Sequence, residues 1–204
     1  RLGRVAMPLG VLNIQPMGNS HKLLAVGRNI WEVDTKAWKS KLIEPLEIPA
    51  MEGEGRIVAY AEWVHPEAAG GLGAYPYWST DPIVGRTMAG ILTIDAAKGT
   101  VDHFEIGPPI ANQFPFSAVV LPDRKRAFMT MNKLFEVDMV KRRVTRVKDF
   151  GTTFYAITAN GAGDKLYMSS SGSSLAEVDP GTMAITRRVE LPAKIWDVTV
   201  LPAK

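Results

Sequence analysis

The sequence contains no cysteine among its 204 residues. Disulfide bonds, thiolate metal sites, a cysteine nucleophile and covalent attachment of a c-type haem are therefore excluded within this chain. The absence does not select a cellular compartment, because an oxidising compartment permits disulfides without requiring them.

Histidines and long apolar runs are also scarce. The three histidines, His21, His65 and His103, lie far apart in the sequence and none pairs with another at metal-ligand spacing, so surface or structural roles are expected. No run approaches the ~18 uninterrupted apolar residues of a transmembrane helix. No segment keeps the apolar spacing of an amphipathic helix for more than two turns, which disfavours a helical fold.

Motifs for nucleophilic or nucleotide chemistry are missing as well. Gly70–Gly73 has no third glycine at the spacing of a dinucleotide fingerprint and lacks its strand–turn–helix context. The serine-rich segment Ser169–Ser174 has no nucleophile-elbow pattern. Glu62 and Asp81 are the only acids that we keep as candidate site residues. The sequence therefore contains no self-sufficient active site that we can identify.

The net charge of +3 is modest and does not require an anionic partner. The basic segment Lys141–Arg146 follows an aspartate that ends an apolar run. This position favours a solvated outer strand, where charge discourages edge-to-edge pairing. Binding of nucleic acid or of a protein partner is the alternative.

An aspartate that ends an apolar run recurs along the chain, in the segments WEVD, LTID, FEVD and AEVD, which end at Asp34, Asp95, Asp138 and Asp179. The spacings between these aspartates are 61, 43 and 41 residues. A period of about 40–45 residues is typical of a four-stranded propeller blade. Because the aspartate recurs in every repeat, we expect it to bond backbone N–H groups of the following turn rather than to act as a catalytic acid.

The sequence therefore predicts an all-β protein, a β-propeller of about four four-stranded blades plus one strand. The expected blades span residues 4–52, 53–110, 114–150 and 154–192 of a single domain, 1–204, and residues 195–202 form a closing strand. An inner strand that no blade follows, and a fan of blades with an apolar flank, suggest part of a larger ring.

The second blade contains an insertion of roughly 20 residues, His65–Met88, relative to the other repeats. Its aromatic residues Tyr75, Tyr77 and Trp78 argue against disorder. These residues either cap the mouth of the central channel, or meet another subunit, or belong to a loop that packs on its own blade.

Further aromatic residues align at the start of the innermost strands. Phe116, Phe154 and Trp196 occupy equivalent positions to within about one residue, near the expected mouth of the channel. They either line an apolar tunnel or hold a partner there, or they are wedges that fill the space between blades.

Several segments together carry a family resemblance. They are Asn112–Pro122 (NQFPFSAVVLP), Arg126-Ala127-Phe128 with the FEVD strand end, Thr153-Phe154-Tyr155, Gly163–Tyr167 (GDKLY), the AEVD strand end, and Gly90–Asp95 (GILTID) before a Lys98-Gly99 turn. With the second-blade insertion, the chain from about Gly18 to Leu201 resembles the C-terminal part of the β subunit of quinohemoprotein amine dehydrogenase. The strand-ending aspartates are generic to YVTN-type propellers, whereas the order and spacing are more specific.

The resemblance implies a seven-bladed ring of which this chain forms a part. In that family a small subunit carries a cysteine tryptophylquinone and a larger subunit carries two c-type haems, so no cofactor is expected in this chain. The β propeller holds the small subunit and helps to wall the cavity where a primary amine is oxidised to an aldehyde and ammonia. The cofactor carries the chemistry. The expected location is the periplasm, with no nucleic-acid or membrane partner.

The resemblance also implies which side chains face the substrate cavity or the quinone-bearing subunit. They are Phe114, Phe116, Phe154, Tyr155 and Trp196, with Tyr77 and Trp78 of the insertion. No catalytic residue and no metal ligand is assigned, so the chain is expected to be a non-catalytic subunit of an oxidoreductase. Two alternatives stay open: a stand-alone YVTN-type propeller that acts as a binding module, and a lactonase-like hydrolase.

Overall fold

A computed structural model of the chain describes residues 3–6, 11–18, 20–27, 29–46, 56–59, 72–81, 85–107, 116–130, 132–195, 197–198 and 200. Within these ranges sixteen strands form four antiparallel sheets of four strands each. The predicted all-β class with four four-stranded blades is confirmed. Among the described residues, no helix is long and apolar enough to cross a membrane.

Each sheet lies within one of the four expected ranges. Blade 1 contains β1 (Val11–Pro16), β2 (Lys22–Gly27), β3 (Ile30–Asp34) and β4 (Lys39–Glu44). Blade 2 contains β5 (Arg56–Ala59), β6 (Leu72–Asp81), β7 (Arg86–Asp95) and β8 (Thr100–Gly107). Blade 3 contains β9 (Ser117–Val120), β10 (Arg126–Thr130), β11 (Lys133–Asp138) and β12 (Arg143–Asp149). Blade 4 contains β13 (Phe154–Ala159), β14 (Leu166–Ser170), β15 (Ser174–Asp179) and β16 (Ala184–Glu190).

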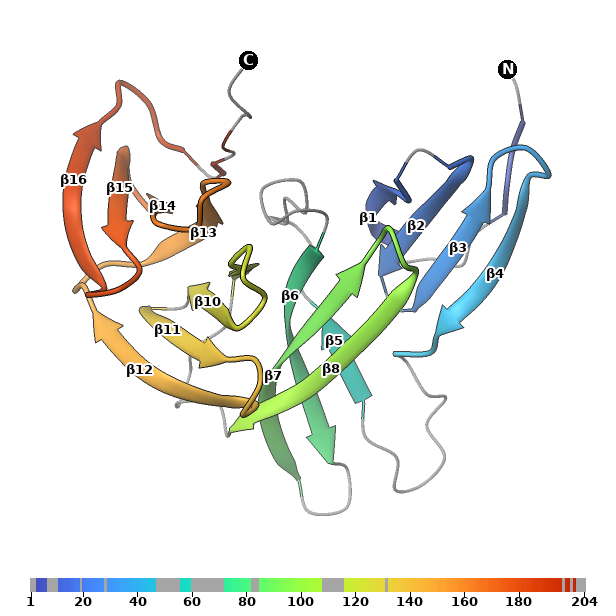
Figure 1. Cartoon of the computed structure of the whole chain (residues 1–204), viewed down its shortest axis with the longest axis horizontal. Helices are drawn as coiled ribbons and strands as arrows, with labels where there is room; N and C mark the ends of the chain where they lie inside the picture. Colours follow the sequence, from blue (N-terminus) through green and yellow to red (C-terminus); the bar gives the residue numbers. More distant parts are fainter. Residues whose placement is uncertain are drawn as a thin grey trace.

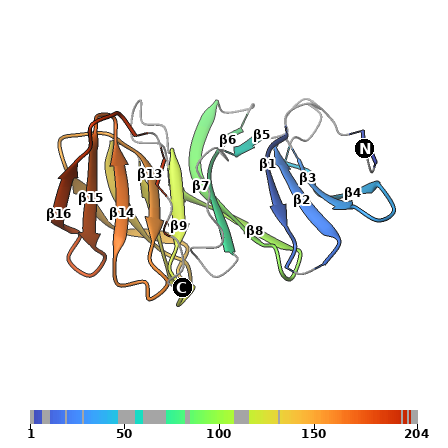
Figure 2. The ribbon, with the colours of Figure 1, turned by 90° about the horizontal axis from the view of Figure 1, so that it is seen from above.

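The four blades form an arc that is open between blade 4 and blade 1 (Figure 1). In every blade the strands follow sequence order, from an inner first strand to an outer fourth strand. Turned by 90°, the sheets stand side by side as twisted layers (Figure 2). Neighbouring sheets therefore present faces to one another, and these faces form the core.

The core is divided among three seams, which we number by the blades that they join. Seam 1/2 contains Leu24, Val26, Ile30 and Leu46 of blade 1 against Tyr75, Tyr77, Leu92 and Ile94 of blade 2. Seam 2/3 contains Ala74, Ala89, Ile91 and Phe104 against Ala118, Val120, Met129, Phe135 and Val137. Seam 3/4 contains Val119, Leu121, Phe128 and Leu134 against Phe154, Ile157, Leu166, Met168 and Val178. Successive side chains of a strand point to opposite faces of the sheet. Blades 2 and 3, which have a neighbour on each side, therefore each contribute to two seams.

The strand-ending aspartates shape the turns between the third and fourth strands. The Oδ1 atom of Asp34 accepts hydrogen bonds from the amides of Lys36 and Ala37, both at 2.8 Å. These two bonds hold the pKa of Asp34 below its ordinary value. Asp95, Asp138 and Asp179 accept equivalent amide bonds through Oδ1. The predicted structural role of the repeated aspartate is confirmed.

A left-handed residue occurs four positions after each aspartate. These residues are Trp38, Gly99, Arg142 and Met183, with φ values of 55°, 65°, 54° and 55°. Only the second turn supplies glycine, which adopts this conformation without strain from a Cβ atom. The geometry of the turn therefore repeats more faithfully than its sequence.

The second blade differs from the sequence-based expectation. Residues 72–81, which we predicted within an inserted loop, form β6, a ten-residue strand between β5 and β7. Pro76 lies opposite Ile91 of β7, one residue before the segment 77–80 that pairs with β5. A proline cannot donate to a neighbouring strand, and its place just beyond the described β5 pairing removes that conflict. The prediction of a loop here is wrong.

The expected closing strand is not seen in the part of 195–202 that the structure describes. Ile195, Asp197, Val198 and Val200 belong to no strand. The amide of Ile195 donates to the carbonyl of Gly172 at 3.4 Å, which ties this segment to blade 4. The other positions of the segment lie outside the described residues.

Replacement of Gly99 by alanine tests the turn geometry. We expect Gly99→Ala to lower the free energy of unfolding by about 1–2 kcal/mol, because a Cβ atom is disfavoured at this φ and would lie 3.1 Å from Met17 Cε. Gly161→Ala is the control, since this position has open space around it and no positive φ. Urea denaturation of both variants measures the difference. Equal stability of the two would contradict the account of the turn.

Candidate functional site

Two predicted site residues meet at the inner side of blades 3 and 4. The rings of Phe116 and Tyr155 lie edge to face, with centroids 4.9 Å apart and an interplanar angle of 62°. The amide of Phe116 donates to the carbonyl of Thr130 at 3.0 Å, which holds this residue in line with β9. Both side chains are partly exposed. We call them the inner aromatic pair.

The inner aromatic pair occupies one position of the repeat. Ser117 pairs with Thr130 and Ala156 with Ser169. On the next strand these partners lie opposite Leu134 and Leu175, each four residues before the strand-ending aspartate of its blade. The residue before each is therefore equivalent, Phe116 in blade 3 and Tyr155 in blade 4. A β-bulge interrupts β13 between Phe154 and Ala156, and Phe154 pairs with Ser170, the next position of the ladder. The predicted alignment of Phe116 with Phe154 therefore holds to within one residue.

Phe154 lies elsewhere. Its side chain is 2% exposed within seam 3/4 and stands edge-on to Phe150, with centroids 5.7 Å apart. This placement corresponds to the wedge between blades that we considered as the alternative.

The aromatic residues of the second blade are strand residues. Tyr75 and Tyr77 are buried in seam 1/2, and burial raises the pKa of both phenols. The amide nitrogen of Gln15 donates to the hydroxyl of Tyr75 across the seam. Trp78 follows on β6 and is partly exposed. Tyr77 faces seam 1/2, on the other side of blade 2 from blade 3, which carries Phe116.

Several predicted residues cannot be placed. Phe114, Trp196, Glu62 and His65 lie outside the described residues, and Asp81 is the last residue of β6. Within the described ranges, no three His, Asp or Glu side chains are grouped so that they could hold a metal ion.

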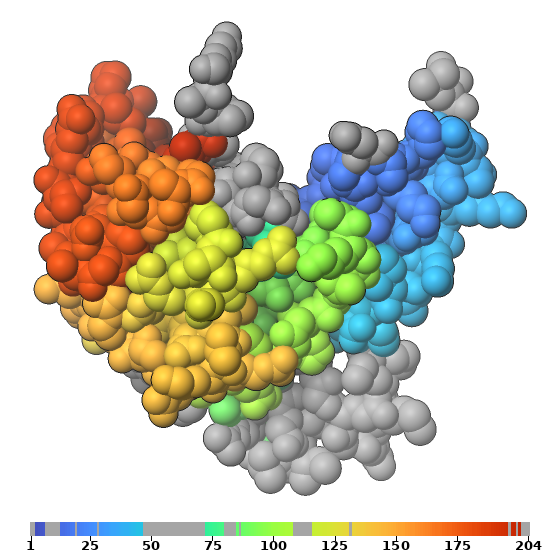
Figure 3. Space-filling model, viewed as in Figure 1, coloured from blue at the N-terminus to red at the C-terminus, as the bar shows by residue number. Residues whose placement is uncertain are grey.

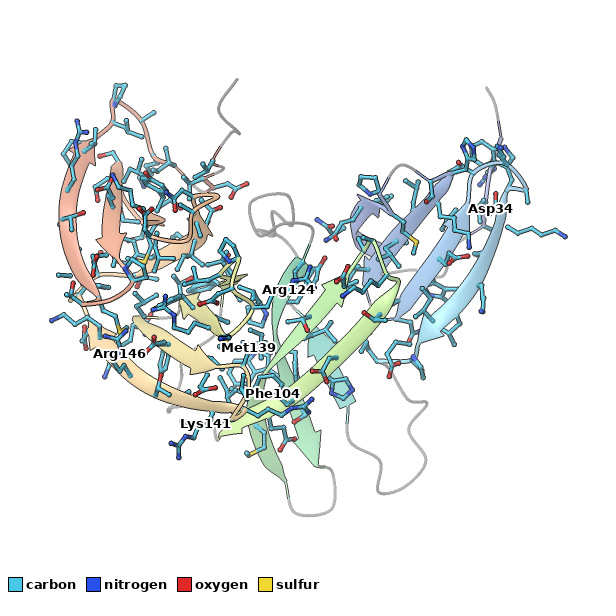
Figure 4. All side chains as sticks on the ribbon, viewed as in Figure 1. Asp34, Phe104, Arg124, Met139, Lys141 and Arg146 are labelled. Carbon is cyan, nitrogen blue, oxygen red and sulfur yellow. The ribbon has the colours of Figure 1, made fainter. Side chains whose placement is uncertain are left out.

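Charged residues connect the outer parts of blades 3 and 4. Arg146 belongs to the basic segment Lys141–Arg146, for which the sequence predicted a solvated outer strand but no bridge to the next blade. The Nε atom of Arg146 lies 2.5 Å from Glu136 Oε2, and the same guanidinium donates to the carbonyls of Pro180 and Gly181 in blade 4. Figure 4 shows Arg146 between the outer strands of the two blades. The hydrogen bond from Arg146 is the main cause that holds the pKa of Glu136 below its ordinary value. Seam 3/4 is therefore closed by a guanidinium bridge.

Seam 2/3 is closed in a similar way. Arg124 of blade 3 lies 2.7 Å from Asp95 of blade 2, and Arg142 donates to both carboxylate oxygens of Asp102 at 3.0 Å. The Arg142 guanidinium also lies 5.1 Å from the centre of the Phe104 ring. Burial raises the pKa of Asp95, but the hydrogen bond from Arg124 and that from the Lys98 amide outweigh it, so the net pKa is lowered.

Seam 1/2 has lysines at its rim and an open groove of about 550 Å³. The groove lies between blade 1 and the tip of the β7–β8 hairpin, which meets blade 1 in the space-filling view (Figure 3). It is lined by Met17, Ser20, Lys22, Glu32, Lys41, Leu42, Ile43, Ala97, Lys98 and Gly99. We call this feature the lysine groove. A smaller cavity of about 350 Å³ lies on blade 3 beside Lys125, Arg126 and Glu136.

Comparisons with known proteins support the fold alone. No family model and no curated protein matches the chain. Hydrazine synthase from Kuenenia stuttgartiensis aligns over 92% of this chain and 51% of its own, with a TM-score of 0.57 and 13% identity. Apo AztD from Citrobacter koseri aligns over 95% and 50%, with a TM-score of 0.50 and 14% identity. The chain spans about half the length of each, and it shares with them a β-propeller-like architecture.

The ion pair of Glu136 and Arg146 at seam 3/4 predicts that the stability of the protein depends on pH. A carboxyl whose folded pKa is lowered contributes stability that is present above its ordinary value of 4.5 and is lost as the pH falls through the folded pKa. We expect Glu136→Gln to lower the free energy of unfolding by about 1–3 kcal/mol at pH 7, because it removes the carboxylate to which Arg146 donates. The loss is smaller than for a fully buried ion pair, since the Arg146 guanidinium is partly exposed. The difference from wild type should shrink as the pH falls below 4.5 and towards the lowered folded pKa, because the wild-type carboxylate then also becomes neutral.

Urea denaturation at pH 7 and at pH 3.5 measures this difference. Glu190→Gln is the control, because Glu190 is an exposed acid at the end of β16. A gap between wild type and Glu136→Gln that stays constant over this range would contradict the assigned bridge.

Proposed function

We propose that this chain is a scaffold part of a periplasmic, quinone- and haem-dependent amine dehydrogenase. The observation that carries the proposal is the inner aromatic pair, Phe116 and Tyr155, at one repeat position of two adjacent blades. Partly exposed aromatic rings are favoured anchors of protein interfaces, because they bury a large area with few rotatable bonds. In this proposal they contact the quinone-bearing small subunit.

In this proposal the partner subunits carry the chemistry and this chain positions them. The cysteine tryptophylquinone of the small subunit and the c-type haems of a second subunit would carry the oxidation of a primary amine and the electron transfer. This chain would position the small subunit and wall the apolar side of the cavity. The inner aromatic pair suits that role, since aromatic rings exclude water and accommodate a hydrocarbon chain.

We further propose that the four blades belong to a seven-bladed ring. The arc of blades is open on one side (Figure 1), and both matched structures are about twice as long as this chain. A ring of seven blades, at about 40–45 residues each, has room for the additional sheets.

The proposal predicts what accompanies the protein when it is isolated from its source. Native mass spectrometry should show this chain with a smaller and a haem-bearing chain, and the visible spectrum should show quinone and c-haem absorbance. A colourless, folded species that contains this chain alone would contradict the proposal.

Matched variants test the inner aromatic pair itself. We expect Phe116→Ala and Tyr155→Ala each to weaken retention of the small subunit by about tenfold or more, as for an interface anchor. Val140→Ala is the control, because Val140 is 74% exposed in the β11–β12 turn. Affinity of the purified small subunit for each variant, measured with thermal stability, separates lost binding from lost folding. Equal affinity for all three variants would exclude the pair as the anchor.

A further inference from the structure

We propose that the lysine groove in seam 1/2 binds a small organic anion, a carboxylate or phosphate monoester with an apolar body. The groove has a volume of about 550 Å³, within the usual range of ~300–1,000 Å³ for ligand sites. This site lies on the outer part of blades 1 and 2 and does not depend on the dehydrogenase proposal.

Among the described residues, no guanidinium bridge crosses this seam, and we infer that the groove stays open for this reason. Lys41 of β4 lies opposite Glu32 of β3 in the strand register, just as Arg146 of β12 lies opposite Glu136 of β11. Arg146 extends from this position to two carbonyls of the next blade. Within the described residues, Lys41 makes no equivalent bond to the β7–β8 turn. An ammonium is a single point charge and cannot form the forked contact of a guanidinium, so the space remains open.

The charges around the groove favour an anion. Lys22 and Glu32 form an ion pair of 2.8 Å, which neutralises the single carboxylate of the lining. Lys98 Nζ is 3.5 Å from Asp95 Oδ2, but that oxygen is held more closely by Arg124, at 2.7 Å. Lys41 forms no ion pair among the described residues. Lys41 therefore offers an unpaired positive charge to a ligand in the groove, and Lys98 offers a second that it shares with Asp95.

The floor of the groove favours an apolar body on that anion. Met17, Leu42 and Ile43 contribute the apolar lining, and Leu42 is 42% exposed. Met17 also lies against the turn at Gly99, so the floor joins both blades. A ligand with a ring or short hydrocarbon would cover this exposed surface, whereas an inorganic anion would not. Lysines suit carboxylate and phosphate groups, because they bind as mobile point charges.

Phenyl phosphate is the probe that we would use first. Titration followed by backbone amide NMR shifts should move the signals of Ser20, Lys98 and Gly99. We expect benzyl alcohol and benzylamine to bind at least tenfold more weakly, since the first has no charge and the second has the wrong one. Inorganic phosphate should bind more weakly than phenyl phosphate, because it leaves Leu42 exposed.

Variants distinguish a built site from general attraction to a basic surface. The double variant Lys41→Gln/Lys98→Gln should lower the affinity for phenyl phosphate about tenfold or more. Leu42→Ser should lower it for phenyl phosphate but not for inorganic phosphate. Lys148→Gln is the control, since this exposed lysine of β12 lies outside the groove.

Two results would overturn the proposal. One is the absence of shifts at the groove amides with phenyl phosphate up to its solubility. The other is an equal loss of affinity in Lys148→Gln and in the double variant. Neither result affects the inner aromatic pair, so failure here is distinct from failure of the dehydrogenase proposal.

Discussion

Packing of one sheet face against the next is the interaction on which this chain depends. Phe128 and Met129 are adjacent in β10, both are fully buried, and they face different neighbours, blade 4 and blade 2. A side chain of this size contributes about 1.5–3 kcal/mol when it is fully buried. A single blade in water would expose one such residue on each face, so no sheet of this kind is expected to be stable without its neighbours.

Charged residues at the outer rim of the blades add hydrogen bonds and ion pairs to this apolar packing. Arg124, Arg142 and Arg146 each join two blades, and their partners are carboxylates or backbone carbonyls of the adjacent blade. Since a guanidinium presents several donors in a fixed plane, one side chain can bond a carboxylate and a turn at once. Seam 1/2 uses lysines at this level and keeps an open groove. The outer rim of the blades therefore carries structural bridges in seams 2/3 and 3/4, and in seam 1/2 it carries the groove that we propose as a ligand site.

The repeat of aspartates predicted the number of sheets and the bonding in their turns, because both depend on short segments of sequence. The alignment of the inner strands held to within one residue, but no local pattern announces the bulge at Tyr155, which leaves Phe154 buried in seam 3/4 and Tyr155 partly exposed. Strand β6 was missed because Gly73 and Pro76 resemble a loop sequence. The bridges were missed for a different reason: Asp95 and Arg124, or Asp102 and Arg142, are 29 and 40 residues apart and meet only when two blades pack.

We expect seams 2/3 and 3/4, which have guanidinium bridges, to be held more firmly than seam 1/2. Native-state hydrogen exchange, followed strand by strand, tests this most directly, because it measures the free energy of local opening. The account predicts that β10, β11 and β14 exchange together in the slowest group and that β2 and β3 of blade 1 open at a lower free energy. Protection of β2 and β3 equal to that of β10 and β11 would contradict it.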